Sequence, residues 1–485
     1  MVLWSLSLVI MLPLLKLLLG ILIKKHYTVH RVFVSLVILA SLALSISLPI
    51  SQKIYSIDFG FIQLKFMCDI YSYLFGILVN IVWFITNLYS YAYIRLNIAR
   101  QRLGHFSHYF SLSIFAVFAN GYAADLWTLF IFYTLLIFLT APLILSNLSK
   151  LSVQANRLYL LTHVSSSFLF FLPAMLLVHY HTGSVLFDSQ YGLANLNNTW
   201  LAAPILALFV FGISKNCILP FHHWISRSII APTPVSGLLH SVAAVKSGSI
   251  AILKIVVYIF GLEYTRVLTQ HFWTGGWVYW LCGITAIYAA YRAWKTNHLK
   301  KRFAYSTISQ LSYILLAIFI ATPLSLMAGV LHIISHSLCK IVLFYIAGIF
   351  SSVYQLNDTK DIAKIAPHMK FWILCIAFSG ASIIGFPWLP GSFGKDYMIL
   401  ADIQTQNYWP ILFLVVGSII NILYIYPVVK AGFFVKPTEI VPFVRKPIPL
   451  SMASAVIFAI GLAIAMSIFI NPLVAFFQQY LATTN

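Results

Sequence analysis

The sequence predicts an all-α polytopic membrane protein with about 14 transmembrane helices, arranged as two inverted five-helix repeats in which helices 7 and 12 are broken. Three observations lead to this prediction. Of the 485 residues, 61% are apolar and 8% are charged, whereas soluble domains carry about 25% charged residues. Apolar runs of the ~20 residues that span a bilayer recur along the chain. Proline and glycine interrupt two of these runs around a lysine.

The candidate helices follow one another with short connections, and no loop is long enough for a soluble domain. The first stretch is too long for the apolar region of a signal peptide and lacks a small-residue cleavage site, so we expect it to be retained as a span. The fourteen predicted helices cover residues 2–23, 32–50, 66–93, 106–121, 125–146, 157–180, 201–226, 232–261, 272–294, 303–321, 323–353, 371–399, 408–435 and 450–478.

Basic residues predict the orientation. Thirty Lys and Arg stand against ten Asp and Glu, a formal net charge of +20. No stretch resembles a soluble basic domain, so we expect no nucleic-acid partner. Twenty-one of the basic residues follow odd-numbered helices and three follow even-numbered ones. Because basic loops stay in the cytoplasm, we expect a multi-pass protein of the inner (cytoplasmic) membrane with both termini on the outer face.

The other six basic residues fall inside predicted spans, where a charge costs at least ~2.5–3.5 kcal/mol and indicates function. We expect Lys16, near a helix end, to extend its amine toward the membrane surface. Lys254 lies late in helix 8 and is ambiguous. The four remaining lysines lie too deep in their spans to reach the membrane surface. We expect them to line a polar pathway: Lys215, Lys246, Lys340 and Lys395.

Helix 11 contains the stretch "HIISHSLCK", in which His332, His336 and Lys340 recur every four residues. At this spacing the three side chains share one helix face. A single histidine here would favour a hydrogen bond to a neighbouring helix. Three basic groups beside other buried lysines favour a proton wire, because desolvated lysine and histidine both exchange protons near neutral pH.

The two interrupted spans are helix 7, "FGISKNCILPFHHW", and helix 12, "GFPWLPGSFGKDYMIL". Proline frees backbone carbonyls, which a membrane tolerates where the backbone is buried or lines a wet cavity. The breaks are five helices apart, and an odd offset implies opposite directions across the membrane. We therefore predict N-terminal helices 1–3 in residues 1–104, inverted repeats in 105–262 and 263–436, and helix 14 in 437–485.

The cysteines give no sign of a cofactor. Cys68, Cys217, Cys282, Cys339 and Cys375 stand far apart in apolar surroundings, with no CxxC pair. They are typical of small core residues rather than metal ligands or disulfides. The chain also lacks flavin, iron–sulfur and nucleotide motifs. We expect no cofactor, no metal and no catalytic residue in this chain.

Four motifs carry a resemblance to a known family. The most specific is "LPFHHWISRSIIAPTPVSGLLHSVAAVKSGSIAILK"; "KRFAYSTISQLSYILL", "LHIISHSLCKIVLFYIAG" and "GFPWLPGSFGKDYMIL" follow in order. Over residues 105–436 the chain resembles the antiporter-like subunits: the L, M and N subunits of respiratory complex I, the A and D subunits of Mrp cation/proton antiporters, and their relatives in membrane-bound hydrogenases. The form "HSVAAVKSG" is most similar to the Mrp D-type and hydrogenase-type subunits.

The resemblance implies a fourteen-helix subunit with a hydrated row of lysines and histidines along the mid-plane of the membrane. Matched position by position, the proton relay consists of Lys215, His240, Lys246, His332, His336, Lys340 and Lys395, the last at the exit. Lys254, Asp396 and Thr134 are possible members of the pathway. The resemblance also implies other integral membrane subunits as partners, with protons and Na⁺ as the candidate transported ions.

The sequence departs from the family at one position. The family has a glutamate in helix 5, paired with the helix-7 lysine, where this chain has Thr134 in "FIFYTLLIF". Asp125 is nine residues away, ~13 Å along a helix, and cannot replace it. Among the ten acids we expect Asp396 alone to be buried deeply. Several unpaired cations cannot be buried together, so the lysines are largely neutral, or a partner supplies acids, or an anion enters.

Three functions compete at this point. The first is a proton-translocating, antiporter-like subunit of a multisubunit antiporter or of a complex I-like NADH dehydrogenase or hydrogenase; the redox chemistry would then belong to other subunits. The second is a relative coupled to inorganic-carbon or anion transport, suggested by the excess of buried cations. The third is a scaffold subunit that no longer pumps, suggested by Thr134. The presence of six costly buried basic residues argues against the third: Lys215, Lys246, His332, His336, Lys340 and Lys395.

Thr134→Glu tests the importance of the missing acid. A carboxylate there should stabilise the ammonium form of Lys215, because an opposite charge nearby favours the charged form. We expect the pH profile of proton transport to move to higher pH, measured with a pH-sensitive dye in vesicles. A profile identical to that of the wild type would contradict this pairing.

Overall fold

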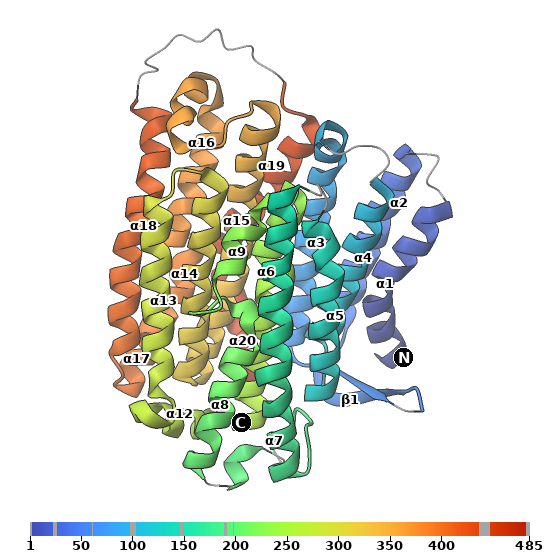
Figure 1. Ribbon diagram of the computed structural model, residues 1–485, viewed down its shortest axis with the longest axis vertical. Helices are drawn as coiled ribbons and strands as arrows, with labels where there is room; N and C mark the ends of the chain where they lie inside the picture. The colour runs from blue at the N-terminus through green and yellow to red at the C-terminus, as the bar shows by residue number, and fades with distance from the viewer. Residues whose placement is uncertain are drawn as a thin grey trace.

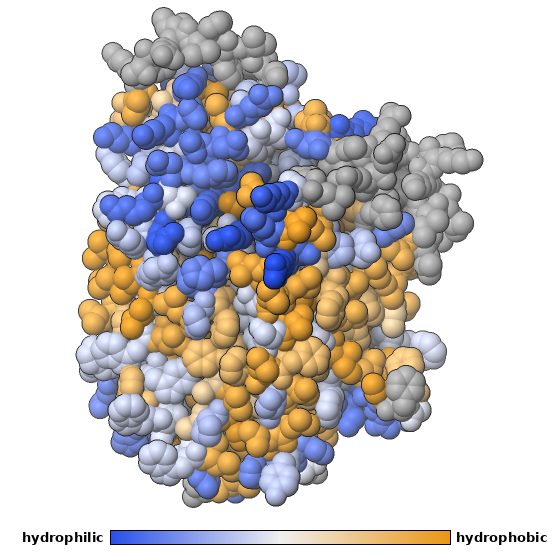
Figure 2. Space-filling model, in the orientation of Figure 1, coloured by the Kyte–Doolittle hydropathy of each residue, from blue (hydrophilic) through white to orange (hydrophobic). Residues whose placement is uncertain are grey.

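The computed structural model describes residues 2–22, 27–60, 62–97, 103–145, 149–188, 192–196, 198–435 and 447–481. Within these ranges the chain is an elongated bundle of helices that run mostly along the long axis (Figure 1). Figure 2 shows hydrophilic residues gathered toward the upper end, near α16, above a broad hydrophobic belt. Several basic residues used to predict the orientation lie outside the described ranges: Lys24, Lys25, Arg100, Arg102, Lys436, Arg445 and Lys446. Glu439, one of the ten acids, also lies outside them.

Each predicted span of the N-terminal half contains helical structure. The helices are α1 (Val2–Leu22), α2 (Tyr27–Ser47), α3 (Ile70–Asn97), α4 (Leu103–Gly121) and α5 (Leu126–Ile144), then α6 (Lys150–Ser166), η2 (Ser167–Phe171) and α7 (Leu172–Thr182), then η4 (Leu193–Leu196), α8 (Thr199–Gly212), η5 (Ser214–Asn216), α9 (His223–Arg227) and η6 (Ser228–Ile230), then α10 (Thr233–Leu238), η7 (Leu239–Ala243), α11 (Val245–Lys254) and η8 (Ile255–Phe260).

The C-terminal half is also helical. Its elements are α12 (Leu262–Gln270), η9 (Phe272–Gly276), α13 (Trp277–Lys295), α14 (Leu299–Ile320), α15 (Pro323–Val353), η10 (Thr359–Asp361), α16 (Ile362–Ile384), α17 (Pro390–Thr405), α18 (Trp409–Phe433), α19 (Leu450–Ile468) and α20 (Ile470–Leu481). Nine helices in the described part of the chain are long and apolar enough to cross a membrane. The all-α membrane fold is thus confirmed, while the count of fourteen spans stays a prediction.

A β-hairpin interrupts the N-terminal helices and was not predicted. Strands β1 (Ser51–Asp58) and β2 (Gln63–Cys68) pair antiparallel at the lower end in Figure 1. The predicted helix start at residue 66 is wrong, because Met67 N–H bonds to the carbonyl of Tyr122, 2.8 Å away, instead of starting a helix. Helix α3 begins after Asp69, whose carboxylate accepts from Ser72 N–H at 2.6 Å as an N-cap.

Both predicted helix breaks are present. Along span 7, α8 ends at Gly212 and the chain resumes as α9 only at His223, with the short η5 between them. Along span 12, α16 ends at Ile384 and α17 begins at Pro390. Proline cannot donate to the preceding turn, so each break leaves carbonyl groups without a helical partner. The carbonyls at the second break bind Lys395, as described below.

Helix α15 forms the centre of the C-terminal half. It runs for 31 residues and nearly all of its side chains are buried. A capping box of Thr322 and Ser325 fixes its start. It packs against helices on several sides, namely α14, α16, α17, α19 and α10. The side chains of α15 therefore face other helices rather than lipid. Buried polar groups can find hydrogen-bond partners on those helices.

Candidate proton pathway

The three basic side chains of α15 are buried and point to different neighbours. His332 and His336 expose 4% and 2% of their surface, and Lys340 exposes none. His332 Nε2 lies 3.1 Å from Gln310 Oε1 on α14. Lys340 Nζ donates to Phe303 O at 3.0 Å and to Ser306 Oγ at 2.7 Å. The helix thus presents one row of basic groups to the helices around it.

Lys246 and His336 are in direct contact. Lys246 Nζ lies 2.5 Å from His336 Nδ1, which joins α11 to α15. Both side chains are buried. A proton held between an amine and an imidazole can move from one to the other along this hydrogen bond. This contact unites two of the residues predicted for the relay.

Lys395 is held by the broken end of α16. Its amine donates to the carbonyls of Ile383 and Ile384, at 3.0 and 2.7 Å, and to Ser418 Oγ at 2.9 Å. The two carbonyls are free to accept because α16 stops there. The break predicted from the prolines therefore supplies the partners of the lysine.

Two glycines let helices approach each other beside the basic groups. A methyl group at Gly394 would lie 2.9 Å from His332 Cβ, so glycine allows α17, which carries Lys395, to pack closely on α15. A methyl group at Gly248 would lie 3.0 Å from Lys215 Cβ, and α11 carries both Gly248 and Lys246. The predicted relay residues on these segments are thus brought into adjoining parts of the fold.

Lys215 sits at the first break and contacts α5. Its amine donates to the carbonyl of Tyr133 at 2.7 Å and lies 3.7 Å from the centre of the Tyr133 ring. The backbone N–H of Lys215 donates to the phenol oxygen of the same tyrosine at 3.2 Å. A neutral carbonyl and an aromatic face therefore occupy the place where the resemblance led us to expect a carboxylate.

Thr134 does not contact Lys215 through its side chain. Its hydroxyl donates to the carbonyls of Phe130 and Ile131 in its own helix, at 2.8 and 2.9 Å. Asp125 caps the start of α5, accepting from Thr128 N–H at 2.6 Å. Neither residue replaces the missing glutamate.

The prediction that Asp396 is the one deeply buried acid is wrong, since its side chain is exposed. One residue after Lys395, it is turned ~100° around α17 and faces outward. The buried acids in the described part of the chain are Asp69, Asp125 and Asp402. Asp402 lies two turns after Lys395 on α17, and both of its carboxylate oxygens lack a hydrogen-bond partner.

Other buried polar atoms without partners accompany the row. They belong to His240, Gln310, Tyr313, His332, His336, Asn216, Ser309 and Asn421. His240 stacks on Phe344, with ring centres 4.5 Å apart, on the π-helical turn η7. Such turns occur often at functional sites. Polar residues inside predicted spans were the signal by which Gln310, Asn421 and Tyr313 could have been found from the sequence.

The prediction for Lys16 is wrong. Lys16 exposes 5% of its surface, and its amine donates to Ser111 Oγ on α4 at 2.6 Å. The polar serine lies within reach between α1 and α4, so the amine turns inward instead of extending to the membrane surface.

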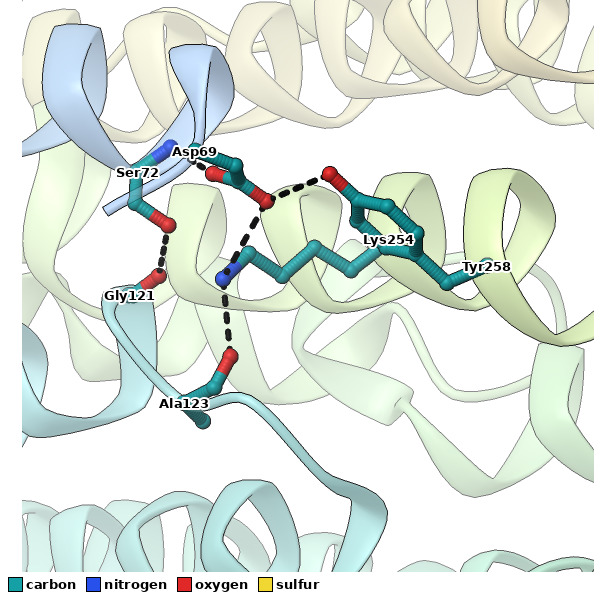
Figure 3. Close-up of polar contacts among 6 residues, drawn as sticks. All are labelled: Asp69, Ser72, Gly121, Ala123, Lys254 and Tyr258. Carbon is teal, nitrogen blue, oxygen red and sulfur yellow. Dashed lines mark hydrogen bonds and ion pairs between the residues drawn. The ribbon is translucent and has the colours of Figure 1, made fainter. Parts of the chain in front are cut away.

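Lys254 forms a buried ion pair that the sequence did not reveal (Figure 3). Its amine lies 3.7 Å from Asp69 Oδ2 and donates to Ala123 O at 2.8 Å. Tyr258 donates its hydroxyl proton to the same carboxylate oxygen at 3.0 Å. Both charged side chains are almost fully buried. The pair joins α11 to the start of α3 and is separate from the contacts of the basic row.

Among the described residues there is no group of three or more His, Cys, Asp or Glu side chains that could hold a metal. The five cysteines are free and buried.

Together these features define a polytopic membrane protein built around a buried row of proton-binding side chains. The family model described as "NADH:quinone oxidoreductase/Mrp antiporter, TM" matches residues 123–421, more than half of the chain. The chain therefore belongs to the NADH:quinone oxidoreductase/Mrp antiporter family. The resemblance inferred from the four motifs is confirmed.

Individual relatives agree with this assignment. The D subunit of an Na⁺/H⁺ antiporter from Alkalihalophilus pseudofirmus is 25% identical over 482 residues, which cover 92% of this chain and 93% of that protein. A chain of the Mrp complex from Dietzia sp. superposes with a TM-score of 0.84 and 18% identity, over 99% of this chain and 97% of that one. A chain of the archaeal membrane-bound sulfane sulfur reductase has the same TM-score, 19% identity and 99% coverage of both chains. The structural matches show the same fold.

Asp69→Asn tests the ion pair. Removing one partner leaves a buried unpaired charge, which costs about 3–5 kcal/mol, so we expect a clearly lower melting temperature in detergent. Asp69→Asn combined with Lys254→Met should recover most of that loss, because no charge then remains unpaired. Asp58→Asn, in the exposed hairpin, is the matched control. Equal melting of the single and control variants would contradict a stabilising pair.

Proposed function

We propose that this chain is a proton-translocating, antiporter-like subunit of a multisubunit membrane complex. The contact between Lys246 Nζ and His336 Nδ1 carries the proposal, because it joins two helices through groups that can both take up a proton. Family membership supports the proposal. The proposed relay passes through Lys215, Lys246, His336 and His332 to Lys395, with His240 and Lys340 beside it.

Water completes this relay. Buried polar atoms are normally hydrogen-bonded, and those without a protein partner mark sites where ordered water binds. Such unpartnered atoms belong to Gln310 on α14, His332 on α15 and Asn421 on α18. Proton transfer then proceeds in short steps between amine, imidazole and water, with the net charge of the row kept low.

The outlet lies at the lower end in Figure 1. A cavity of about 960 Å³ opens beyond the end of α17 and is lined by Tyr279, Thr405 and Asn407 among others. Asp402, between Lys395 and this cavity along α17, is the acid placed to receive a proton on the way out. Lys395 and Asp402 are seven residues apart, ~10 Å along the helix, a gap that water must bridge.

The orientation follows from the basic loops. We place the chain in the inner (cytoplasmic) membrane, with the hydrophilic upper end of Figure 2 in the cytoplasm and both termini on the outer face. The residues 105–262 and 263–436 then form two repeats of opposite direction. Each contains one break and one lysine at that break, Lys215 or Lys395.

Other integral membrane subunits complete the complex. The relatives and structural neighbours are components of an Na⁺/H⁺ antiporter, an Mrp complex and a respiratory membrane complex. Protons are the transported ion of this chain, and a cation such as Na⁺ is the coupled ion of an antiporter. In a respiratory assembly, other subunits would perform the redox reaction.

One observation favours a second candidate, transport coupled to an anion such as an inorganic-carbon species. The amines of Lys215, Lys340 and Lys395 bind neutral carbonyl and hydroxyl groups, with no carboxylate among their hydrogen-bond partners in the described structure. A basic core of this kind attracts anions. Proton transport that depends on bicarbonate would support the second candidate; proton transport in its absence supports the first.

Lys246→Met tests the relay in the intact complex. Methionine keeps the length and removes the exchangeable proton, so we expect proton transport to fall on the order of 100-fold, as for loss of a positioned proton carrier. The measurement is dye-reported acidification of membrane vesicles. Lys150→Met, at the exposed start of α6, is the matched control. Undiminished transport by an assembled Lys246→Met complex would contradict the relay and leave the scaffold function.

A further inference from the structure

We propose that His163 on α6 is the proton-carrying partner of Lys215 and takes the place of the carboxylate that this chain lacks on α5. This inference rests on the proposed proton-translocating function. It names the group that loads and unloads the first lysine of the row, a residue that no motif of the sequence singled out.

The described elements packed most closely around His163 contain no acid. Those that pack most closely against α6 are α5, η2, η5, α9 and η6, and none of their sequences contains Asp or Glu. The titratable or charged side chains on these elements are Tyr133, Lys215, His223 and Arg227, joined by His222 just before α9 and by Tyr159 on α6 itself; the other two charged residues of α6, Lys150 and Arg157, are exposed. His163 is the imidazole that bonds to Ser214, the residue directly before Lys215.

A short hydrogen-bonded cluster joins His163 to Ser214, the residue before Lys215. His163 Nδ1 and Ser214 Oγ are joined by a hydrogen bond of 2.7 Å. Ser214 Oγ also lies 2.6 Å from Ser166 Oγ. Ser214 directly precedes Lys215, whose backbone N–H and amine both bind Tyr133. The imidazole therefore adjoins the polar pocket of the lysine through one hydroxyl group.

His163 is placed to exchange protons rather than to fill space. It is fully buried, and its second nitrogen, Nε2, has no hydrogen-bond partner. Tyr159 and Trp224 hold the ring from two sides, with centres 4.6 and 4.5 Å away. A buried polar atom without a partner is costly unless it serves a function or meets water. A fixed ring with one free nitrogen can accept a proton there and release one toward Ser214.

Charge balance explains why an imidazole can replace a carboxylate. A lysine paired with a glutamate alternates between a neutral pair and a pair with one net charge. Two neighbouring bases instead share a single proton, because two buried cations side by side repel each other strongly. Moving that proton between His163 and Lys215 changes which group is charged while the pair keeps a net charge of +1.

The chain uses the same kind of pair elsewhere. Lys246 is bonded to an imidazole, His336, and no acid shares that contact in the described structure. In the proposed repeats, α6 is the counterpart of α15, the helix that carries His332 and His336. His163 therefore stands on the helix where the second repeat has its histidines, which supports a common role.

His163→Asn tests the assignment, because asparagine can keep the hydrogen bond to Ser214 but cannot carry a proton. In the intact complex we expect proton transport to fall about tenfold or more, as for loss of a positioned proton carrier. Adding Thr134→Glu should restore it: Lys215 Nζ already binds the carbonyl of residue 133, so a longer acidic side chain at 134 starts within reach. The restored transport should have a different pH profile from the wild type. His179→Asn, on an exposed site of α7, is the control.

Each outcome decides the question. Loss in His163→Asn with recovery in the double variant supports the proposal, because an acid on another helix could not repair a purely structural defect. Wild-type transport and pH profile in His163→Asn would overturn it, and so would a loss in an assembled complex that Thr134→Glu does not repair. If His163→Asn fails to assemble, His163→Gln carries the same test. Failure of the proposed function itself is distinguishable, since Lys246→Met would then transport normally.

Discussion

The whole arrangement depends on the cost of burying positive charge without negative charge. Lys215, Lys340 and Lys395 bind carbonyl, hydroxyl and aromatic groups, and Lys246 binds an imidazole. Neutral acceptors stabilise an ammonium group only in part, so these amines cannot all be charged together. Charging one of them disfavours charge on the next, which couples the sites along the row. In the proposed relay, this coupling would make the charge on one group depend on the charge of its neighbour.

Lys254 shows the contrasting use of a buried lysine. Asp69 lies 3.7 Å from its amine, and Tyr258 and Ser72 donate hydrogen bonds to the two oxygens of the carboxylate. These contacts stabilise the charged forms of both side chains. The pair therefore joins α11 to the start of α3 and does not favour proton exchange. The chain thus separates its lysines into one that fixes helices and several that remain free to change charge.

Local composition was enough to predict part of this structure. Hydropathy located the helices, proline located both breaks, and the cost of charge in a span singled out Lys246 and Lys395. Local composition could not predict contacts between segments that are distant in the sequence. Asp69 falls inside the third predicted span, yet it caps that helix and meets Lys254. A single sequence does not give the rotation of a helix, so it favoured Asp396 over Asp402. The hairpin of β1 and β2 also bonds to a distant segment, since Met67 N–H donates to the carbonyl of Tyr122.

The hydrogen bonds that hold Lys395 have a consequence for how the sequence around it can vary. Its acceptors include the main-chain oxygens of Ile383 and Ile384, which every amino acid supplies. Substituting either isoleucine would leave the oxygen in place, so the lysine's environment is insulated from ordinary point changes there. What defines the environment is the position at which α16 stops. Insertions, deletions and shifted prolines would move the end of α16 and so change the environment of Lys395. A comparison of residue identities alone would overlook that change.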